Sequence, residues 1–158
     1  MKSTFLTLIK NLNDEHKKCL IWFQNNKGKT IHGWPEKISD RYFLATKAKG
    51  IYKPKGLKYA LSIRRSLKGP YKDILKENNF NKKFNFEYFQ ENKDIRKNLF
   101  EYTNVAMTNC ISDVIPIGVI IQTKPKPQST YKILGTGIVK KWEKGYFFIK
   151  GFDENGEI

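Results

Sequence analysis

Few residues of the kinds that build metal sites, disulfide frameworks or membrane spans occur in this sequence. Its 158 residues include two cysteines and two histidines. Cys19 and Cys110 lie far apart in apolar segments and lack the paired spacing of a zinc site, so we expect two buried free thiols, no metal and no other cofactor. No apolar run approaches the roughly 20 residues of a membrane helix, and residues 1–12 do not follow the pattern of a signal peptide. These absences predict a cytoplasmic protein that does not bind a membrane.

Acidic residues are also scarce. The chain has 15 Asp and Glu against 30 Lys and Arg, a formal net charge of +15. From Arg41 to Lys72 there are ten Lys or Arg and no acid. Such a segment repels itself unless a polyanion neutralises it, and nucleic acid is the commonest polyanion in a cytoplasm. Coding bias in an AT-rich genome accounts for an excess of lysine but not for the local absence of acids, so a nucleic-acid partner is favoured.

The apolar content is sufficient for one packed domain. Hydrophobic residues make up 39% of the chain and aromatic residues 14%, and a chain of this length builds one sizeable core. Asn13, followed by two acids, predicts the N-terminus of a helix. An apolar stripe over residues 19–23 continues this helix, and Gly28 is expected to end it.

After residue 35 the pattern changes to short β-type runs separated by Gly and Pro. These runs are residues 42–46, 58–66, 84–89, 115–123, 131–141 and 146–151. A further helix is expected over residues 99–111, capped near Thr103 or Asn104. The order predicts an α+β fold in which a mostly antiparallel sheet curls into a barrel, with an N-terminal helix and one or two flanking helices. We expect a helical extension (1–39), a barrel domain (40–152) and a short tail (153–158).

Two loops combine positive charge with turn residues. Residues 47–56 form a basic segment in which Ile51 and Tyr52 are expected at the tip, where they could enter a DNA groove while lysines contact phosphates. Residues 124–127, Lys-Pro-Lys-Pro, predict a stiff connector between two strands. This connector is either a second cationic contact or a solvated hairpin turn.

Five segments of the sequence, taken in order along the chain, point to one family. They are Tyr-Ala-Leu-Ser-Ile at 59–63, Gly-Pro-Tyr-Lys-Asp at 69–73, the helix-opening Tyr-Thr-Asn to Asn-Cys at 102–110, Ile-Pro-Ile-Gly-Val-Ile-Ile-Gln at 115–122, and the Tyr-, Gly- and Trp-containing stretch 131–149. In this order they resemble the SRA (SET- and RING-associated) family over residues 40–152. With Lys-Gly-Ile-Tyr-Lys-Pro-Lys at 49–55 and Tyr-x-Gln-Glu at 88–91, the chain most resembles the SRA-like modules beside HNH domains in McrA-type, modification-dependent restriction endonucleases.

The resemblance implies binding of duplex DNA that contains 5-methylcytosine or 5-hydroxymethylcytosine, with the modified base flipped into a pocket. Tyr71 and Tyr88 would be the two rings that replace the lost stacking, and Asp73 would accept a hydrogen bond from the cytosine amino group. Phe89 and Gln90 would form the pocket wall. Taken singly, each of these residues also fits an ordinary turn, strand or surface position.

The other residues expected to contact DNA are basic or lie in the basic segment. They are Lys47, Lys49, Ile51, Tyr52, Lys53, Lys55, Arg64, Arg65, Lys93, Arg96, Lys97, Lys124 and Lys126. By the resemblance, residues 49–56 match one DNA-inserting loop, with positions 51–53 as wedge candidates. A second such loop is expected, shortened, over residues 92–98.

No catalytic centre is expected. His16 and His32 precede the resembling region, do not fit an HNH motif and are expected to be surface or capping residues. Asp73 with Glu91 and Lys93 fits the spacing of a metal-dependent nuclease only loosely, and this remains a minor alternative. A second alternative is a PUA-like RNA-binding module. The expected partners are modified duplex DNA and an HNH nuclease domain or protein, and the chain is expected to be a monomer or homodimer.

Overall fold

Three helices and eight strands make up the part of the chain that the computed structural model describes, namely residues 3–47, 49–67, 74–78, 80–90 and 101–158. The helices are α1 (Thr4–Ile9), α2 (Asp14–Asn25) and α3 (Tyr102–Asp113). The strands are β1 (Thr30–His32), β2 (Ile51–Tyr52), β3 (Ser62–Arg65), β4 (Ile74–Glu77), β5 (Phe84–Phe89), β6 (Ile117–Lys124), β7 (Thr130–Glu143) and β8 (Tyr146–Gly151). No helix of this part combines the length and the apolar character needed to cross a membrane.

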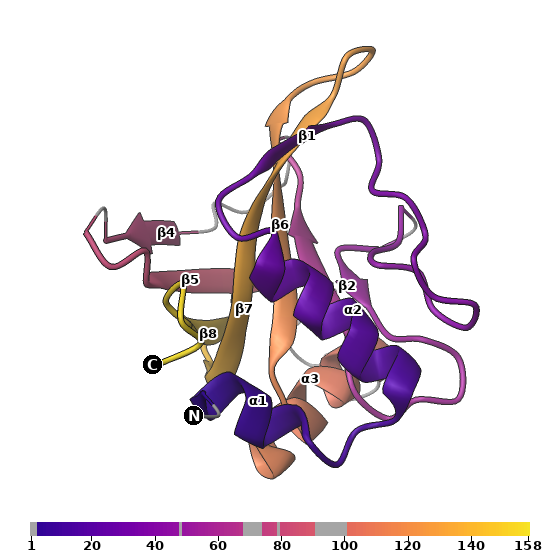
Figure 1. Cartoon of the computed structure of the whole chain (residues 1–158), viewed down its shortest axis with the longest axis vertical. Coiled ribbons are helices and arrows are strands. Elements are labelled where there is room, and N and C mark those ends of the chain that lie inside the picture. Colours follow the sequence, from indigo (N-terminus) through magenta and orange to yellow (C-terminus); the bar gives the residue numbers. More distant parts are fainter. Residues whose placement is uncertain (1–2, 48, 68–73, 79, 91–100) are drawn as a thin grey trace.

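The eight strands form one curled sheet with the order β2-β3-β6-β7-β8-β5-β4, and β1 lies beside β7. The strands pair antiparallel except β3 with β6, which are parallel. The guanidinium carbon of Arg65 on β3 lies 5.9 Å from the ring centre of Phe86 on β5, although three strands separate β3 from β5 in the sheet. Figure 1 shows α2 lying across β6 and β7, and the β6–β7 hairpin projecting beyond the other strands. The expected α+β fold with a mostly antiparallel, curled sheet is confirmed, although the sheet ends in edges at β2 and β4 rather than closing.

Strand β6 lies between two hydrophobic cores. Its side chains alternate in direction, as in any strand, so that Val119 and Ile121 join one cluster and Ile120 joins the other. We call the first cluster, which includes Phe86 of β5, the inner core. The second, which includes Phe23 of α2, is the outer core. The sheet therefore has two covered faces, and each residue of the candidate site can be assigned to one of them.

Helix α2 packs closely on the sheet because Gly118 has no side chain. A Cβ at this position would lie 2.3 Å from the Phe23 ring. Phe23 is fully buried, and burying such a ring stabilises the fold by about 3 kcal/mol. The helix begins where the sequence predicts, since the Asn13 side-chain oxygen accepts a hydrogen bond from the backbone N–H of His16 at 2.8 Å.

Residues 42–46, predicted as a strand, have an irregular conformation. Tyr42, Leu44 and Ala45 are buried in the outer core. The Ser62 hydroxyl on β3 donates a hydrogen bond to the carbonyl of Leu44 at 2.6 Å. The apolar residues of this segment therefore reflect packing onto the sheet and not pairing within it.

Two other expectations are wrong. Thr103 and Asn104 do not cap α3, because Glu101 is its N-cap residue and both side chains are buried in the first turn. His16 is not a surface residue. It is 0% exposed, since positions 16, 19, 20 and 23 share the buried face of α2.

Candidate nucleic-acid interface

Tyr88 contacts the start of the basic segment through Gly50. The Tyr88 side chain belongs to the inner core and is 7% exposed, with its ring centre 6.1 Å from that of Phe86. A Cβ at Gly50 would lie 1.7 Å from the Tyr88 hydroxyl oxygen and 3.2 Å from the Arg64 carbonyl oxygen. The backbone of Gly50 also accepts a hydrogen bond from the Arg64 N–H at 2.7 Å. A glycine is therefore required here, and β5 is tied directly to the segment that leads into β2.

The structure brings together only some of the residues expected to form the base pocket. Gln90 is 4% exposed, and its side-chain oxygen accepts a hydrogen bond from the Trp142 indole at 2.9 Å, on the inner-core side. Phe89 points to the other face of β5, where its ring meets Tyr146 edge-on with ring centres 5.1 Å apart. Tyr88 and Gln90 thus share a face and Phe89 does not. Tyr71 and Asp73 lie outside the described residues.

The expectation that Ile51 and Tyr52 form a loop tip is wrong. They form β2, in which Ile51 pairs with Ile63 and Tyr52 with Ser62. Ile51 is 1% exposed in the inner core, and its burial is worth about 2 kcal/mol. The Tyr52 hydroxyl accepts a hydrogen bond from the backbone N–H of Phe43 at 3.0 Å. The exposed turn of this segment is instead formed by residues 55–56.

The expected DNA-contacting cations differ in how far the protein itself uses them. Lys49 pairs with Glu101 at 3.5 Å, and its ammonium lies 4.4 Å from the ring centre of Tyr102. The Lys53 ammonium donates to the Pro54 carbonyl at 3.3 Å. Among the lysines expected to contact DNA, Lys47, Lys55, Lys124 and Lys126 are exposed, and the described residues supply no carboxylate partner for them. Positions 93, 96 and 97 lie outside the described residues.

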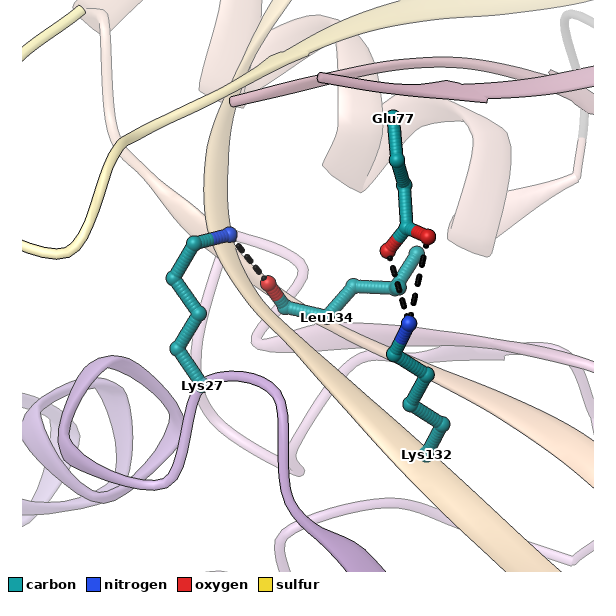
Figure 2. Close-up of polar contacts among 4 residues, drawn as sticks. All are labelled: Lys27, Glu77, Lys132 and Leu134. Atoms are coloured by element: carbon teal, nitrogen blue, oxygen red, sulfur yellow. Dashed lines mark hydrogen bonds and ion pairs between the residues drawn. The ribbon is translucent and has the colours of Figure 1, made fainter. Parts of the chain in front are cut away.

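Two further lysines carry charge that the fold itself engages. Figure 2 shows the Lys132 ammonium pointing at the Glu77 carboxylate, 3.1 Å from each oxygen, and the Lys27 ammonium pointing at the Leu134 carbonyl at 2.7 Å. The Lys27 ammonium also lies 4.7 Å from the ring centre of Phe84. Burial lowers the pKa of Lys27 to about 8. The positive charge available to a polyanion is therefore smaller than the composition suggests. The exposed lysines named above carry part of this available charge.

Three of the expected DNA contacts meet in one pocket of about 570 Å³ on the outer-core side. The residues that line it are Trp34, Lys47, Arg64, Ser66, Gln122, Lys126, Pro127, Ser129 and Tyr131. Charge alone predicts Lys47, Arg64 and Lys126 from the sequence, but it does not predict Trp34. Its only sequence signal was its place in the Gly-Trp-Pro turn just before the basic region.

The expectation of two buried free thiols is confirmed. Cys19 and Cys110 are buried and free, and burial raises the pKa of both thiols. Across the described ranges, no group of three or more His, Cys, Asp or Glu side chains is close enough to hold a metal ion.

Comparison with known proteins gives likenesses of fold only. No protein-family profile matches the chain, and no curated protein matches it. A crystal structure of KRYPTONITE in complex with mCHG DNA and SAH is 23% identical, over 64% of this chain and 23% of that chain, with a TM-score of 0.38. A second, of KRYPTONITE in complex with mCHH DNA, H3(1-15) peptide and SAH, is 18% identical, over 92% and 38%, with a TM-score of 0.42. The chain thus spans less than half the length of either neighbour, and the closer relation to McrA-type modules stays a prediction.

Proposed function

We propose that this chain binds duplex DNA containing 5-methylcytosine or 5-hydroxymethylcytosine and holds the modified base, flipped out of the duplex, against Tyr88. The observation that carries the proposal is the contact between the Tyr88 hydroxyl and Gly50. Through it, an aromatic ring on the inner side of the sheet adjoins the backbone of the most basic segment of the chain. DNA that is bound by this segment would therefore lie close to Tyr88, and the Tyr88 ring, which is 7% exposed, would have to turn out of the inner core to stack on an extruded base.

The chemistry of base extrusion fits the residues assigned to the pocket. Extrusion costs a few kcal/mol of stacking and pairing, and stacking on an aromatic side chain returns about 1–3 kcal/mol. In this proposal Tyr71 supplies the second ring and Asp73 accepts from the cytosine amino group, which is a donor that thymine lacks. Gln90, fixed by its bond to Trp142, brings an amide to the same face as Tyr88.

The exposed lysines supply the part of the binding energy that does not depend on sequence. Lys47 precedes β2, Lys55 lies between β2 and β3, Lys124 ends β6, and Lys126 lies in the β6–β7 loop. Lysines contacting phosphates displace condensed counterions, so affinity falls as salt rises. This contribution is common to all duplexes, and the modified base is distinguished only in the pocket.

The biological setting follows from the sequence resemblance alone. We place the chain as the recognition module of a modification-dependent restriction system in which an HNH nuclease domain or partner cuts the DNA. Catalysis is not assigned to this chain in the proposal.

Binding to matched duplexes tests the function. Oligonucleotides identical except for one cytosine, 5-methylcytosine or 5-hydroxymethylcytosine are titrated across a range of salt, with a fluorescent base analogue opposite the target to report extrusion. We expect a preference of about tenfold or more, equivalent to about 1.4 kcal/mol, at every salt concentration. Asp73→Ala and Tyr88→Leu should abolish the preference while retaining the salt dependence.

Two results would remove the proposal. One is equal affinity for all three duplexes at every salt concentration. The other is displacement of the duplexes by hairpin RNA at much lower concentration, which would favour an RNA-binding module. Tyr88→Phe serves as the matched control for folding, because it keeps the buried ring and should retain most of the preference.

A further inference from the structure

Arg64 and Arg65 lie on opposite faces of the sheet. Successive side chains of a strand alternate in direction, and on β3 the Arg65 guanidinium lies 5.9 Å from the ring centre of Phe86 in the inner core. The Arg64 guanidinium lies 5.6 Å from the ring centre of Trp34, which packs against the outer core. The pocket around Trp34 is therefore separated from Tyr88 by the sheet.

One wall of this pocket is aromatic and fixed. The rings of Trp34 and Tyr131 meet edge-on at 90°, with centres 5.4 Å apart. Tyr131 is 7% exposed and belongs to the outer core, whereas Trp34 is half-buried. The indole is thus supported from behind and still borders the open pocket.

Two cations share the indole ring. The Lys47 ammonium lies 5.5 Å from the ring centre, close to the 5.6 Å of Arg64. Lys126 borders the same pocket from the β6–β7 loop. The described lining contains no acidic side chain, so the protein does not offset the mutual repulsion of these cations at the pocket, and a bound anion would do so.

The two cations beside Trp34 differ in mobility. The Arg64 guanidinium donates hydrogen bonds to the carbonyls of Thr46 at 3.4 Å and Lys47 at 3.3 Å, and to the Ser66 hydroxyl. These bonds fix the Arg64 guanidinium, which in turn holds the backbone of Lys47. The Lys47 side chain is exposed and can turn from the indole to a ligand, which would open part of the ring.

We infer that this pocket binds one unpaired nucleotide, with its phosphate among Lys47, Arg64 and Lys126 and its base on Trp34. Phosphate is recognised by converging cations and a base by an aromatic face, and this pocket offers both. Its volume of about 570 Å³ lies within the range of small-molecule sites. The inference goes beyond the proposed function, because it requires neither a duplex nor a modified base. The nucleotide can be free or part of a single strand.

Four ligands identify what the pocket binds: inorganic phosphate, thymidine monophosphate, a twelve-residue oligothymidylate and the same oligomer in a duplex. Binding is measured by calorimetry on the full chain. We expect the single strand to bind more tightly than phosphate alone, and Trp34→Leu to weaken it about tenfold or more, since stacking on an aromatic ring is lost. Lys126→Gln should weaken it to a smaller extent, and Lys10→Gln, which removes an exposed charge from the end of α1, should not.

The outcomes distinguish the source of the nucleotide. If Trp34→Leu weakens both the monophosphate and the strand, the pocket takes free nucleotides. If it weakens the strand alone, the pocket takes an unpaired residue of a polymer. If Trp34→Leu changes the binding of neither phosphate, nor the monophosphate, nor the strand, the pocket is an anion site only and the inference is overturned.

The same variants separate this inference from the proposed function. Trp34→Leu should keep the preference for modified duplexes, because Tyr88 lies on the other face of the sheet. A chain without that preference whose single-strand binding still depends on Trp34 would disprove the proposed function and leave the nucleotide pocket standing. Urea unfolding of Trp34→Leu provides the folding control.

Discussion

The Tyr88 hydroxyl meets the backbone of Gly50, although β5 and β2 are far apart in the order of the sheet. The contact exists because the sheet curls until its two ends approach each other. It makes the geometry of the proposed base pocket dependent on a residue that has no side chain.

Gly50→Ala should therefore disturb both stability and recognition. The new methyl group would overlap the Tyr88 hydroxyl, and relieving such a clash in a packed core costs about 1–3 kcal/mol. We expect this loss in urea unfolding, together with a weaker preference for modified duplexes. In a Tyr88→Phe background, which lacks the hydroxyl, the same substitution should cost less. Equal costs in the two backgrounds would show that the clash is relieved elsewhere.

The buried imidazole of His16 should make the protein sensitive to acid. The ring lies near Tyr42 and Tyr59, and among the described residues neither of its nitrogens has a hydrogen-bond partner. Burial lowers the pKa of His16 from 6.5 to about 4. Since the unfolded chain takes up this proton first, stability falls as the pH drops from about 6.5 to about 4, by at most about 3 kcal/mol.

Urea unfolding between pH 4.5 and 7 checks this expectation. His16→Gln keeps a polar side chain of similar length without a titrating group. Its stability should therefore fall less over this range than that of the parent chain. Parallel curves for the two proteins would mean that other groups cause the acid sensitivity.

Lys27 should make stability rise with pH in the same direction, but at alkaline pH. Burial is the largest cause of its lowered pKa, and the Glu77 carboxylate partly opposes it. Because the folded-state pKa of about 8 lies below the ordinary value of 10.5, the unfolded chain binds more protons between these values and stability rises with pH across them. Lys27→Met removes this dependence, so its stability relative to the parent should decline from pH 7.5 to pH 9.5 in thermal melts. Lys29→Met, at an exposed neighbour, should run parallel to the parent.

The exposed and the engaged lysines should differ in their effect on the salt dependence of DNA binding. Lys126→Gln removes an exposed cation from the projecting β6–β7 loop, and each lost phosphate contact lowers the slope of log affinity against log salt by about 0.9. Lys132→Gln removes a cation already paired with Glu77 and should leave the slope unchanged. The slopes are measured by fluorescence anisotropy with unmodified duplex. An equal change in both variants would contradict the assignment of free and engaged charge.

Much of the fold follows from local patterns, whereas the sites do not. The alternating residues of β5, the apolar runs of β6 to β8 and the capped stripe of α2 predict these elements correctly, because the spacing of apolar residues follows the burial of each element. The same alternation misleads at residues 42–46, where Tyr42 and Leu44 are buried without a pairing strand. Glycine and proline near Ile51 suggest a loop tip, yet pairing with Ile63 makes it a strand. Such outcomes depend on partners distant in sequence.

The candidate sites depend even more on contacts between segments that are distant in sequence. Lys47, Arg64 and Lys126 could be identified by charge, but their meeting point at Trp34 requires three separate segments and the β6–β7 hairpin to converge. The partner of Tyr88 across the curl is a glycine, which carries no chemical signal of its own. Charge and aromaticity thus predict which residues take part and leave their assembly to the tertiary structure.

The parallel ladder between β3 and β6 has a consequence for how charge is distributed. Its register runs from Ser62 opposite Gly118 to Arg65 opposite Ile121, and it decides which arginine meets Trp34 and which meets Phe86. A slip of one residue would exchange them, because it turns each side chain of a strand over. A shift of one residue in this register would thus change the side chains on both faces at once, without changing the composition of the strand.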